Sequence, residues 1–206
     1  MAKQNGKNKR VFWVLWLIPI LTLGYIGWMN LNPVGTTITH RIDVGTEDTK
    51  GAAIISGPFD RISSISTVGD ISYREMLMSG VYFQVEDAKL HDADEIHVRV
   101  RFYDAFPSDA KLILGARDRQ EWSYSWILIY VSSYEQMSDL PTIVENEGGW
   151  IVAEASWKRE DLFIAHDLLD FCFHVPHLGQ TEAQDNTIPI DWIEIRLKIP
   201  PIWERM

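Results

Sequence analysis

The sequence has few of the residues that build disulfides. It contains one cysteine, Cys172, and this count excludes an internal disulfide framework. Because Cys172 stands between Phe171 and Phe173, we expect a buried, inert thiol rather than a nucleophile.

Catalytic motifs are missing as well. The sequence has no Gly-x-Ser-x-Gly elbow, no His-Glu-x-x-His pair and no phosphate-binding glycine loop. A retaining glycosidase needs two carboxylates about 5 Å apart. Neither the region around Glu154 nor the pair Asp191 and Glu194 has the i, i+2 spacing that would place two carboxylates so on one strand. We therefore expect a protein that is not an enzyme, and a glycan-active hydrolase is the least favoured alternative.

Acidic residues are absent from the first 42 positions, and residues 11–31 carry no charge of either sign. A stretch of that length in a helix spans roughly 30 Å, about the thickness of the hydrocarbon core of a bilayer. The basic residues before it are Lys3, Lys7, Lys9 and Arg10. By the positive-inside rule, we expect a cytoplasmic tail at 1–10 and a transmembrane signal anchor in the lipid bilayer at 11–31. A cleaved secretory signal with its apolar region at 11–23 is the alternative, and it also exports the rest of the chain.

The part of the chain after residue 32 is strongly acidic. It carries 15 basic and all 29 acidic side chains, which is a net charge of −14. A domain of this charge is repelled by nucleic acid and by anionic lipid headgroups. We therefore expect no nucleic-acid partner.

Acidic side chains at strand ends and in loops bear on the question of a cofactor. Oxygen-only loop sites suit Ca²⁺ in exported sandwiches, so a structural calcium ion is one explanation of them, and solubility is the simpler one. These side chains are Asp43, Glu47, Asp48, Asp70, Asp185 and Asp191. A second group, His166, Asp167, Asp170, His174 and His177, spans two elements and has a proline between its last two histidines. That spacing makes it a poor zinc ligand set, and we expect no other cofactor.

The region from 38 to 206 has the length of one domain, joined to the apolar stretch by a short linker at 32–37. Apolar residues alternate with polar ones in three clear strands, at Val81–Val85, Ile96–Phe102 and Ile193–Ile199. Weaker strands are predicted at 36–44, 52–56, 62–72, 111–117, 123–132, 150–157 and 170–175. The segment 158–168 is predicted as either a short helix or a loop with one turn. Many short strands separated by Gly and Pro turns predict an all-β fold, an antiparallel, jelly-roll-like β-sandwich preceded by one transmembrane helix.

The end of the chain carries a resemblance to a known architecture. In FCFHVPHLGQTEAQDNTIPIDWIEIRLKI, a strand, a long polar loop and an Ile-rich final strand follow one another. This order resembles jelly-roll sandwiches of the carbohydrate-binding-module kind and extracellular sensor domains of similar shape, and the resemblance covers most of 36–200. It implies an architecture only and carries over no functional residue.

The alternation leaves a second set of side chains opposite the core. If their strands are neighbours, flat aromatic rings share one sheet face with charged groups, which is the chemistry that binds sugars. The predicted ligand-binding residues are Trp122, Tyr124, Trp126, Tyr130, Arg99, Arg101, Trp192 and Glu194. The simpler explanation is a solvated outer face with cross-strand Arg–Glu and aromatic pairs, or a face that packs under a loop.

We therefore expect a membrane-anchored sandwich outside the membrane with a non-catalytic binding role, recognising a glycan or cell-envelope polymer. The alternative is a structural or accessory subunit that binds another envelope or membrane protein. Trp, Tyr and Arg anchor protein interfaces as readily as they bind sugars.

Overall fold

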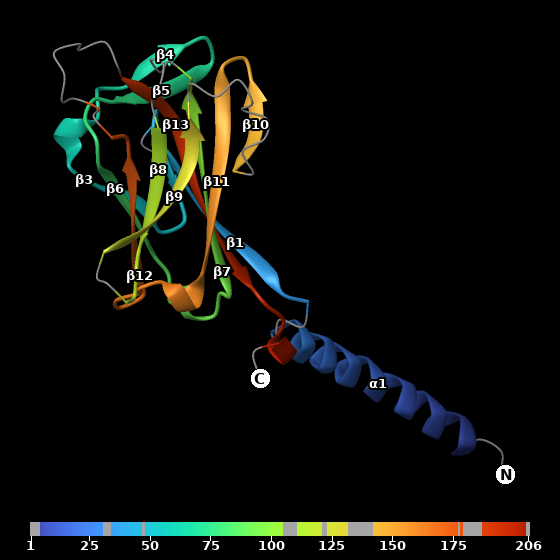
Figure 1. Ribbon diagram of the computed structural model, residues 1–206. Coiled ribbons are helices and arrows are strands. Elements are labelled where there is room, and N and C mark those ends of the chain that lie inside the picture. Colours follow the sequence, from blue (N-terminus) through green and yellow to red (C-terminus); the bar gives the residue numbers. More distant parts are fainter. Residues whose placement is uncertain are drawn as a thin grey trace. The chain divides into compact units, whose positions relative to one another are not determined.

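The computed structural model describes residues 5–30, 34–46, 48–104, 111–120, 123–131, 142–176, 178 and 187–204 (Figure 1). The chain divides into two compact units. One unit consists of Met1–Thr36 together with Pro200–Met206, and the other is Thr37–Ile199.

The first unit holds one long helix. α1 runs from Asn5 to Asn30 and contains Pro19, and its side chains are described from Trp16 to Trp28. Within the residues that the structure describes, no helix combines the length and the apolar character needed to cross a membrane. A short 3-10 turn, η5, covers Ile202–Glu204.

The second unit is a β-sandwich whose described strand pairs are all antiparallel. Sheet A has the order β10-β11-β7-β13-β1-β2, with β5 also beside β13 and β4 beside β5. Its strands are β1 (Thr36–Asp43), β2 (Asp48–Lys50), β4 (Ser66–Val68), β5 (Ile71–Met76), β7 (Glu95–Tyr103), β10 (Ile143–Glu147), β11 (Trp150–Lys158) and β13 (Ile188–Ile199). Sheet B has the order β3-β6-β12-β8-β9. Its strands are β3 (Ala53–Gly57), β6 (Val81–Glu86), β8 (Lys111–Arg117), β9 (Tyr124–Val131) and β12 (Leu168–His174).

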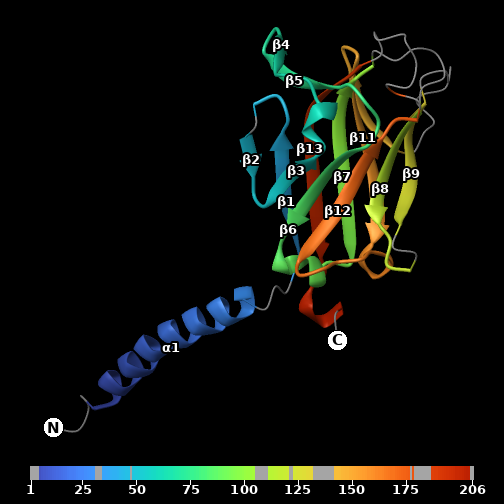
Figure 2. The ribbon, with the colours of Figure 1, turned by 90° about the vertical axis from the view of Figure 1, so that its left-hand side faces the viewer.

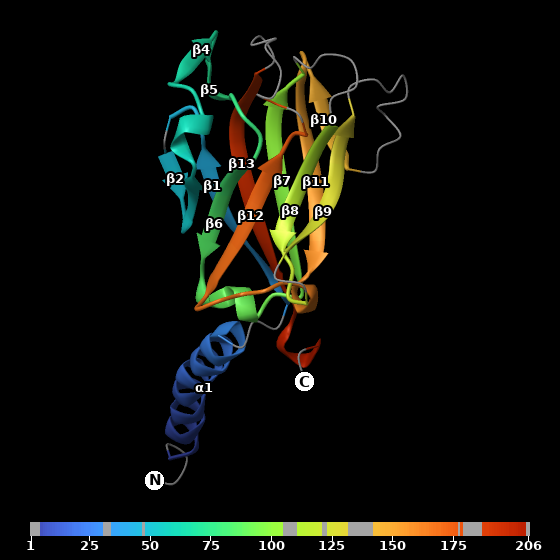
Figure 3. The ribbon, with the colours of Figure 1, turned by 60° about the vertical axis from the view of Figure 1, so that its left-hand side comes forward.

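The core lies between the two sheets, which Figure 2 and Figure 3 show as two layers. The three strongest predicted strands are confirmed as β6, β7 and β13, and their predicted inward residues are buried. Large aromatic rings fill the layer between the two sheets. Phe83 stacks on Phe171 with 5.2 Å between ring centroids, and Phe102 meets Tyr130 edge-on at 5.2 Å. The predicted all-β sandwich is therefore confirmed.

The weaker strands predicted from the sequence are confirmed too, with 62–72 split into β4 and β5. Of the two possibilities for 158–168, the helix is wrong and the loop with one turn is confirmed. Only Arg159–Asp161 forms a 3-10 turn there, η4, and the chain then bends through His166 and Asp167, both with positive φ, into β12. Its apolar residues serve the sandwich, since Leu162 is buried in the core. Further 3-10 turns are η1 (Phe59–Arg61) and η2 (Ala88–His91), and the sequence missed the short strands β2 and β10.

The outer edge of β9 is covered by side chains. Trp157 donates from Nε1 to the carbonyl of Ser125 at 3.3 Å, and Thr142 donates from its hydroxyl to the carbonyl of Ile129 at 3.0 Å. These bonds occupy acceptors that an added strand would need. At this edge, a partner is therefore more easily bound by the outer face of sheet B than by backbone hydrogen bonds to β9.

Gly51 gives a first prediction, because a side chain at this position would collide with His40. Gly51 has φ +81°, and a β-carbon added there would lie 2.2 Å from His40 Nδ1. That nitrogen accepts a hydrogen bond from the backbone of Ala52 at 3.1 Å. We expect Gly51→Ala to lower the free energy of unfolding by about 2–4 kcal/mol in urea titrations. Gly148→Ala, at φ +61° with open space around it, is the matched control and should cost only about 1 kcal/mol. Equal losses in the two variants would contradict the collision.

Candidate functional site

The predicted ligand-binding residues lie on two different sheets. Tyr124 and Trp126 belong to β9 of sheet B, whereas Arg99, Arg101, Trp192 and Glu194 belong to β7 and β13 of sheet A. Because the sheets pack face to face, the outward side chains of one sheet point away from those of the other. The predicted residues that the structure describes therefore do not share the expected single face. Trp122 lies outside the described residues.

Tyr130 corrects a further prediction, since it is a core residue. In the pairing of β8 with β9, Leu112 lies opposite Tyr130 and Ile113 opposite Leu128, so Ile129 is an extra residue that forms a bulge. The bulge changes the alternation and turns Tyr130 inward, where its exposed fraction is 0%. Burial, followed by a hydrogen bond with Asp104, raises the pKa of the Tyr130 phenol.

On sheet A, Arg99 is enclosed by carboxylates. Its register partners on the two neighbouring strands are Glu154 and Glu194. The guanidinium lies 2.9 Å from Glu145, 3.4 Å from Glu154 and 3.7 Å from Glu194, and its side chain is only 10% exposed. These carboxylates already occupy Arg99, so the simpler explanation of a cross-strand ion-pair face holds for Arg99 and Glu194.

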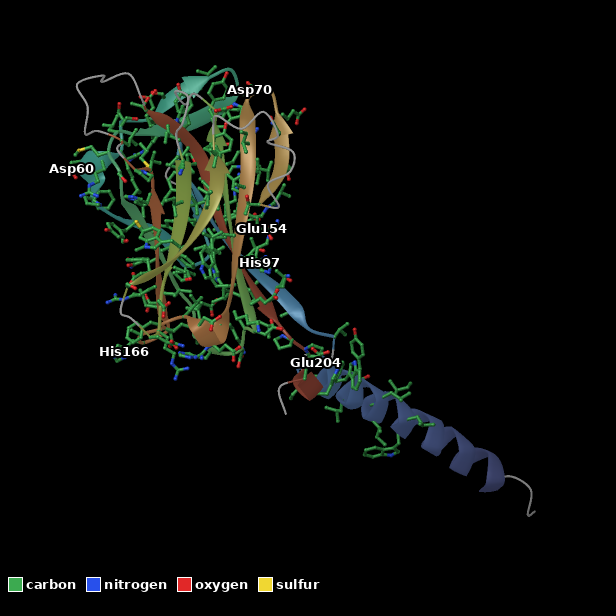
Figure 4. All side chains as sticks on the ribbon, viewed as in Figure 1. Asp60, Asp70, His97, Glu154, His166 and Glu204 are labelled. Carbon is green, nitrogen blue, oxygen red and sulfur yellow. The ribbon has the colours of Figure 1, made fainter. Side chains whose placement is uncertain are left out.

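The network continues along the same face. His97 lies between two carboxylates, with Nδ1 2.7 Å from Glu154 and Nε2 3.0 Å from Glu95. Figure 4 shows His97 and Glu154 side by side on this face of β7 and β11. Lys198 in turn lies 3.0 Å from Glu95. The charged groups of this face therefore bind one another.

The ring of Trp192 is covered rather than presented to solvent. Its exposed fraction is 7%, and the guanidinium of Arg41 lies over the ring at 4.6 Å from the centroid. Arg101 pairs with Asp191 at 2.7 Å and lies 5.2 Å from the ring centroid of Trp150. Trp192 and Arg101 are thus in place on the outer face, but each already has a partner of its own.

No metal site is visible in the described ranges, where no group of three or more His, Cys, Asp or Glu side chains is arranged to hold an ion. Two acids considered for calcium have cationic partners instead, since Asp43 pairs with Arg41 at 2.6 Å and Asp191 with Arg101. Glu47, Asp185 and His177 lie outside the described residues, as does the side chain of Asp48. Members of the histidine and aspartate group, whose spacing made it a poor zinc ligand set, have other partners: Asp167 pairs with His91 at 3.0 Å, Asp170 with Arg117 at 3.1 Å, and His174 with Ser79 at 2.6 Å.

On the outer face of sheet B, two small residues, Cys172 and Gly115, lie between two aromatic ones. Strand register places Tyr82, Cys172, Gly115 and Trp126 in one row across β6, β12, β8 and β9. A β-carbon added at Gly115 would lie 2.7 Å from both Cε3 and Cζ3 of Trp126. The indole therefore rests directly on the backbone of Gly115, and its exposed fraction is 46%.

Three rings converge over this row, and we call Tyr82, Tyr124 and Trp126 the aromatic layer. The ring centroids of Tyr124 and Trp126 are 5.4 Å apart, and those of Tyr82 and Tyr124 are 6.1 Å apart. Tyr82 comes from β6 and the other two from β9, with β12 and β8 between them. The rings can approach one another because Cys172 and Gly115 beneath them are small.

Polar groups border the aromatic layer. Beside Tyr124, Arg117 pairs with Asp170 at 3.1 Å. On the other side, the imidazole of His174 lies 5.5 Å from the Trp126 ring centroid, and its Nδ1 is 2.6 Å from the hydroxyl of Ser79. A flat exposed ring with hydrogen-bonding groups on both sides is the arrangement that packs against a sugar ring and binds its hydroxyls.

The pKa values of the ionisable groups in and under the layer are raised. Burial, followed by the charge of Asp170, raises the pKa of Tyr124 to about 12, and burial raises the pKa of the Cys172 thiol to about 12. The pKa of Tyr82 is also raised, first by Cys172 and then by burial. These shifts extend the pH range in which the two tyrosine hydroxyls stay protonated donors beyond that of an ordinary tyrosine.

Sequence reasoning found Tyr124 and Trp126 but missed Tyr82, Gly115 and His174. The alternation of Val81 and Phe83 does place Tyr82 outward. Its meeting with Trp126 depends on the order of the strands in sheet B, which no local pattern contains.

The raised pKa values predict that the fold loses stability at alkaline pH. Tyr124 and Cys172 have ordinary pKa values of 10.0 and 9.0, so the unfolded chain releases protons that the folded chain keeps up to about pH 12. The free energy of unfolding should therefore be constant to about pH 9 with respect to these groups and fall between pH 9 and 12. Urea titrations across pH 8–12 measure this, and Cys172→Ala should make the fall shallower. An unchanged slope in that variant would argue against the role of the thiol.

The comparisons with known proteins concern the fold. No protein-family model and no curated protein matches the chain. Among similar solved structures, a xylan-binding module CBM15 has a TM-score of 0.43 and 16% identity, covering 79% of this chain and 97% of that one. CBM27-1 of Caldicellulosiruptor saccharolyticus, solved with mannohexaose, has a TM-score of 0.47 and 10% identity, covering 81% and 97%. The mannan-recognising module TmCBM27 has a TM-score of 0.40 and 12% identity, covering 79% and 98%. Carbohydrate-binding modules are thus among the solved structures similar to this chain.

Proposed function

We propose that the sandwich binds a glycan, without catalysis, through the aromatic layer on the outer face of sheet B. The observation that supports this most is the position of Trp126, whose ring lies on Gly115 and is 46% exposed. Burying such a ring against the C–H face of a pyranose removes apolar surface from water on both sides. The neighbouring Tyr124 hydroxyl, the Arg117–Asp170 pair and His174 are then within reach of the sugar hydroxyls.

A protein partner is the second candidate, and Leu128 favours it. Leu128 is 40% exposed and lies two residues beyond Trp126 on the outer face of β9. A Trp and a Leu together form the kind of apolar anchor that docks into a pocket of another protein. In that case the layer would belong to an accessory subunit of the cell envelope.

Substitution of Trp126 tests the glycan site. The full chain, in a detergent without a sugar headgroup, is screened on a glycan array, and binders are measured by titration calorimetry. Trp126→Ala should weaken binding about tenfold or more, because the stacked ring is lost. Gly115→Ala should weaken it too, since the added β-carbon displaces the indole while leaving it present.

Tyr103→Ala is the matched control. Tyr103 is an aromatic residue of the other sheet and is 38% exposed, so its loss should leave glycan affinity unchanged. If the wild-type chain gives no saturable glycan signal and instead co-purifies with an envelope protein in a Trp126-dependent manner, the second candidate replaces the first.

We also propose that residues 11–31 anchor the chain in a membrane, with residues 1–10 in the cytoplasm and the sandwich outside. The absence of charge from 11–31 and the four preceding basic residues support this arrangement. An uncleaved anchor predicts an intact mass of 23.8 kDa in a membrane pellet that resists carbonate extraction. Alkaline phosphatase fused after residue 206 should be active, because the enzyme matures only outside the cytoplasm. A shortened, extractable product would instead support the cleaved signal.

A further inference from the structure

Arg61, the last residue of η1, is fixed beside the aromatic layer by two backbone carbonyls. Its Nη1 donates to the carbonyl oxygen of Ser79 at 2.6 Å and to that of Gly80 at 2.8 Å. Gly80 has φ +82°, and a β-carbon added there would lie 2.7 Å from this same Nη1. The guanidinium therefore fills space that only a glycine leaves open, and its position is set before any ligand arrives.

Arg61 differs in its partners from the five arginines that pair with a carboxylate. Acidic side chains outnumber basic ones by 29 to 19 in this protein. The arginines that pair with a carboxylate are Arg41, Arg99, Arg101, Arg117 and Arg196. Between residues that the structure describes, no ion pair includes Arg61.

The free edge of this guanidinium has the geometry of a carboxylate receptor. With Nη1 bound to the two carbonyls, the N–H groups of Nε and Nη2 remain on the opposite edge. Within the described ranges neither atom has a hydrogen-bond partner, and neither is a buried atom left unsatisfied. These two parallel donors match the two oxygens of a carboxylate, which Arg binds bidentately.

The same guanidinium borders the proposed glycan site. The β-carbon position at Gly80 lies 3.9 Å from the hydroxyl oxygen of Tyr82 and 4.0 Å from Cζ of Arg61. Ser79, which accepts from Arg61, is also bonded through its hydroxyl to His174, the neighbour of Trp126. A sugar stacked on the layer at Tyr82 therefore has this cation at its side.

We propose that Arg61 is a subsite for a carboxylate carried by the bound glycan, so that the ligand is a mainly neutral sugar chain with isolated uronic acid groups. This proposal rests on the glycan site proposed above. We infer that the glycan carries few acid groups, because the net charge of −14 after residue 32 would repel a polyanionic chain. One acid group in contact with Arg61 is less affected, since repulsion from distant charges is screened over about 8 Å at physiological ionic strength.

Matched pairs of oligosaccharides test the subsite on the full chain. The probes are β-linked gluco- and manno-oligosaccharides, each with a counterpart oxidised at one C6 to a carboxylate, and xylo-oligosaccharides with and without one glucuronosyl branch. For at least one pair, the wild-type chain should bind the carboxylated member about fivefold more tightly at low salt. This preference should shrink as sodium chloride rises towards 0.5 M.

Two variants separate the subsite from the layer. Arg61→Gln should lose the preference but still bind the neutral member, whereas Trp126→Ala should lose both. Arg119→Gln, at an exposed arginine of the β8–β9 turn, is the control and should keep the wild-type preference. If Arg61→Gln fails to fold, the salt dependence of the wild-type preference decides the question.

The outcomes distinguish the two proposals. Equal affinity for both members of every pair, with binding still dependent on Trp126, would overturn the carboxylate subsite and leave the glycan site standing. A preference that persists in Arg61→Gln or that salt does not reduce would also overturn it. Absence of binding to all probes, neutral and acidic, would count against both proposals.

Discussion

Each strand of the sandwich gives about every second side chain to the layer between the sheets, and this constraint decides which side chains remain for binding. Phe83, Phe102 and Phe171 fill that layer, so their neighbours along each strand must point outward. The bulge at Ile129 changes the assignment locally and moves Tyr130 from the outer face into the core. What remains outside is divided between two faces that cannot act on one ligand.

The outer faces of the two sheets differ in how many of their charged groups form ion pairs with one another. On sheet A, the nearly buried guanidinium of Arg99 has three carboxylates around it, and a ligand on this face would have to compete with them for that charge. On sheet B, the layer over Gly115 and Cys172 is neutral and has one ring, Trp126, that is half exposed. Binding there removes apolar surface from water and breaks no ion pair, which makes sheet B the better binding face.

Local patterns predicted most of the strands, because alternation and turn residues act over a few positions. They identified β6, β7 and β13 with their buried residues, and they placed Trp126 outward. They did not predict which strands share a sheet, because that depends on pairing between segments distant in the sequence. Tyr124 and Arg99 were expected on one face, yet β9 and β7 join different sheets through pairings with strands far along the chain. The role of Gly115 likewise arises only from the ring that crosses it from β9.

The neutrality of the aromatic layer also bears on how an acidic domain can bind a sugar with an acid group. A tyrosine phenol is neutral at physiological pH, and burial raises the pKa of Tyr124 further, to about 12, so the layer adds no negative charge of its own. Arg117 is already paired with Asp170, whereas Arg61 is held by uncharged carbonyls and keeps its full charge. Arg61 therefore places one cation without a carboxylate partner among the described residues at the Tyr82 end of an acidic domain. Salt screens the repulsion from distant acidic side chains more than it screens the direct contact with Arg61. A single carboxylate can therefore bind there, whereas a highly charged polymer is repelled.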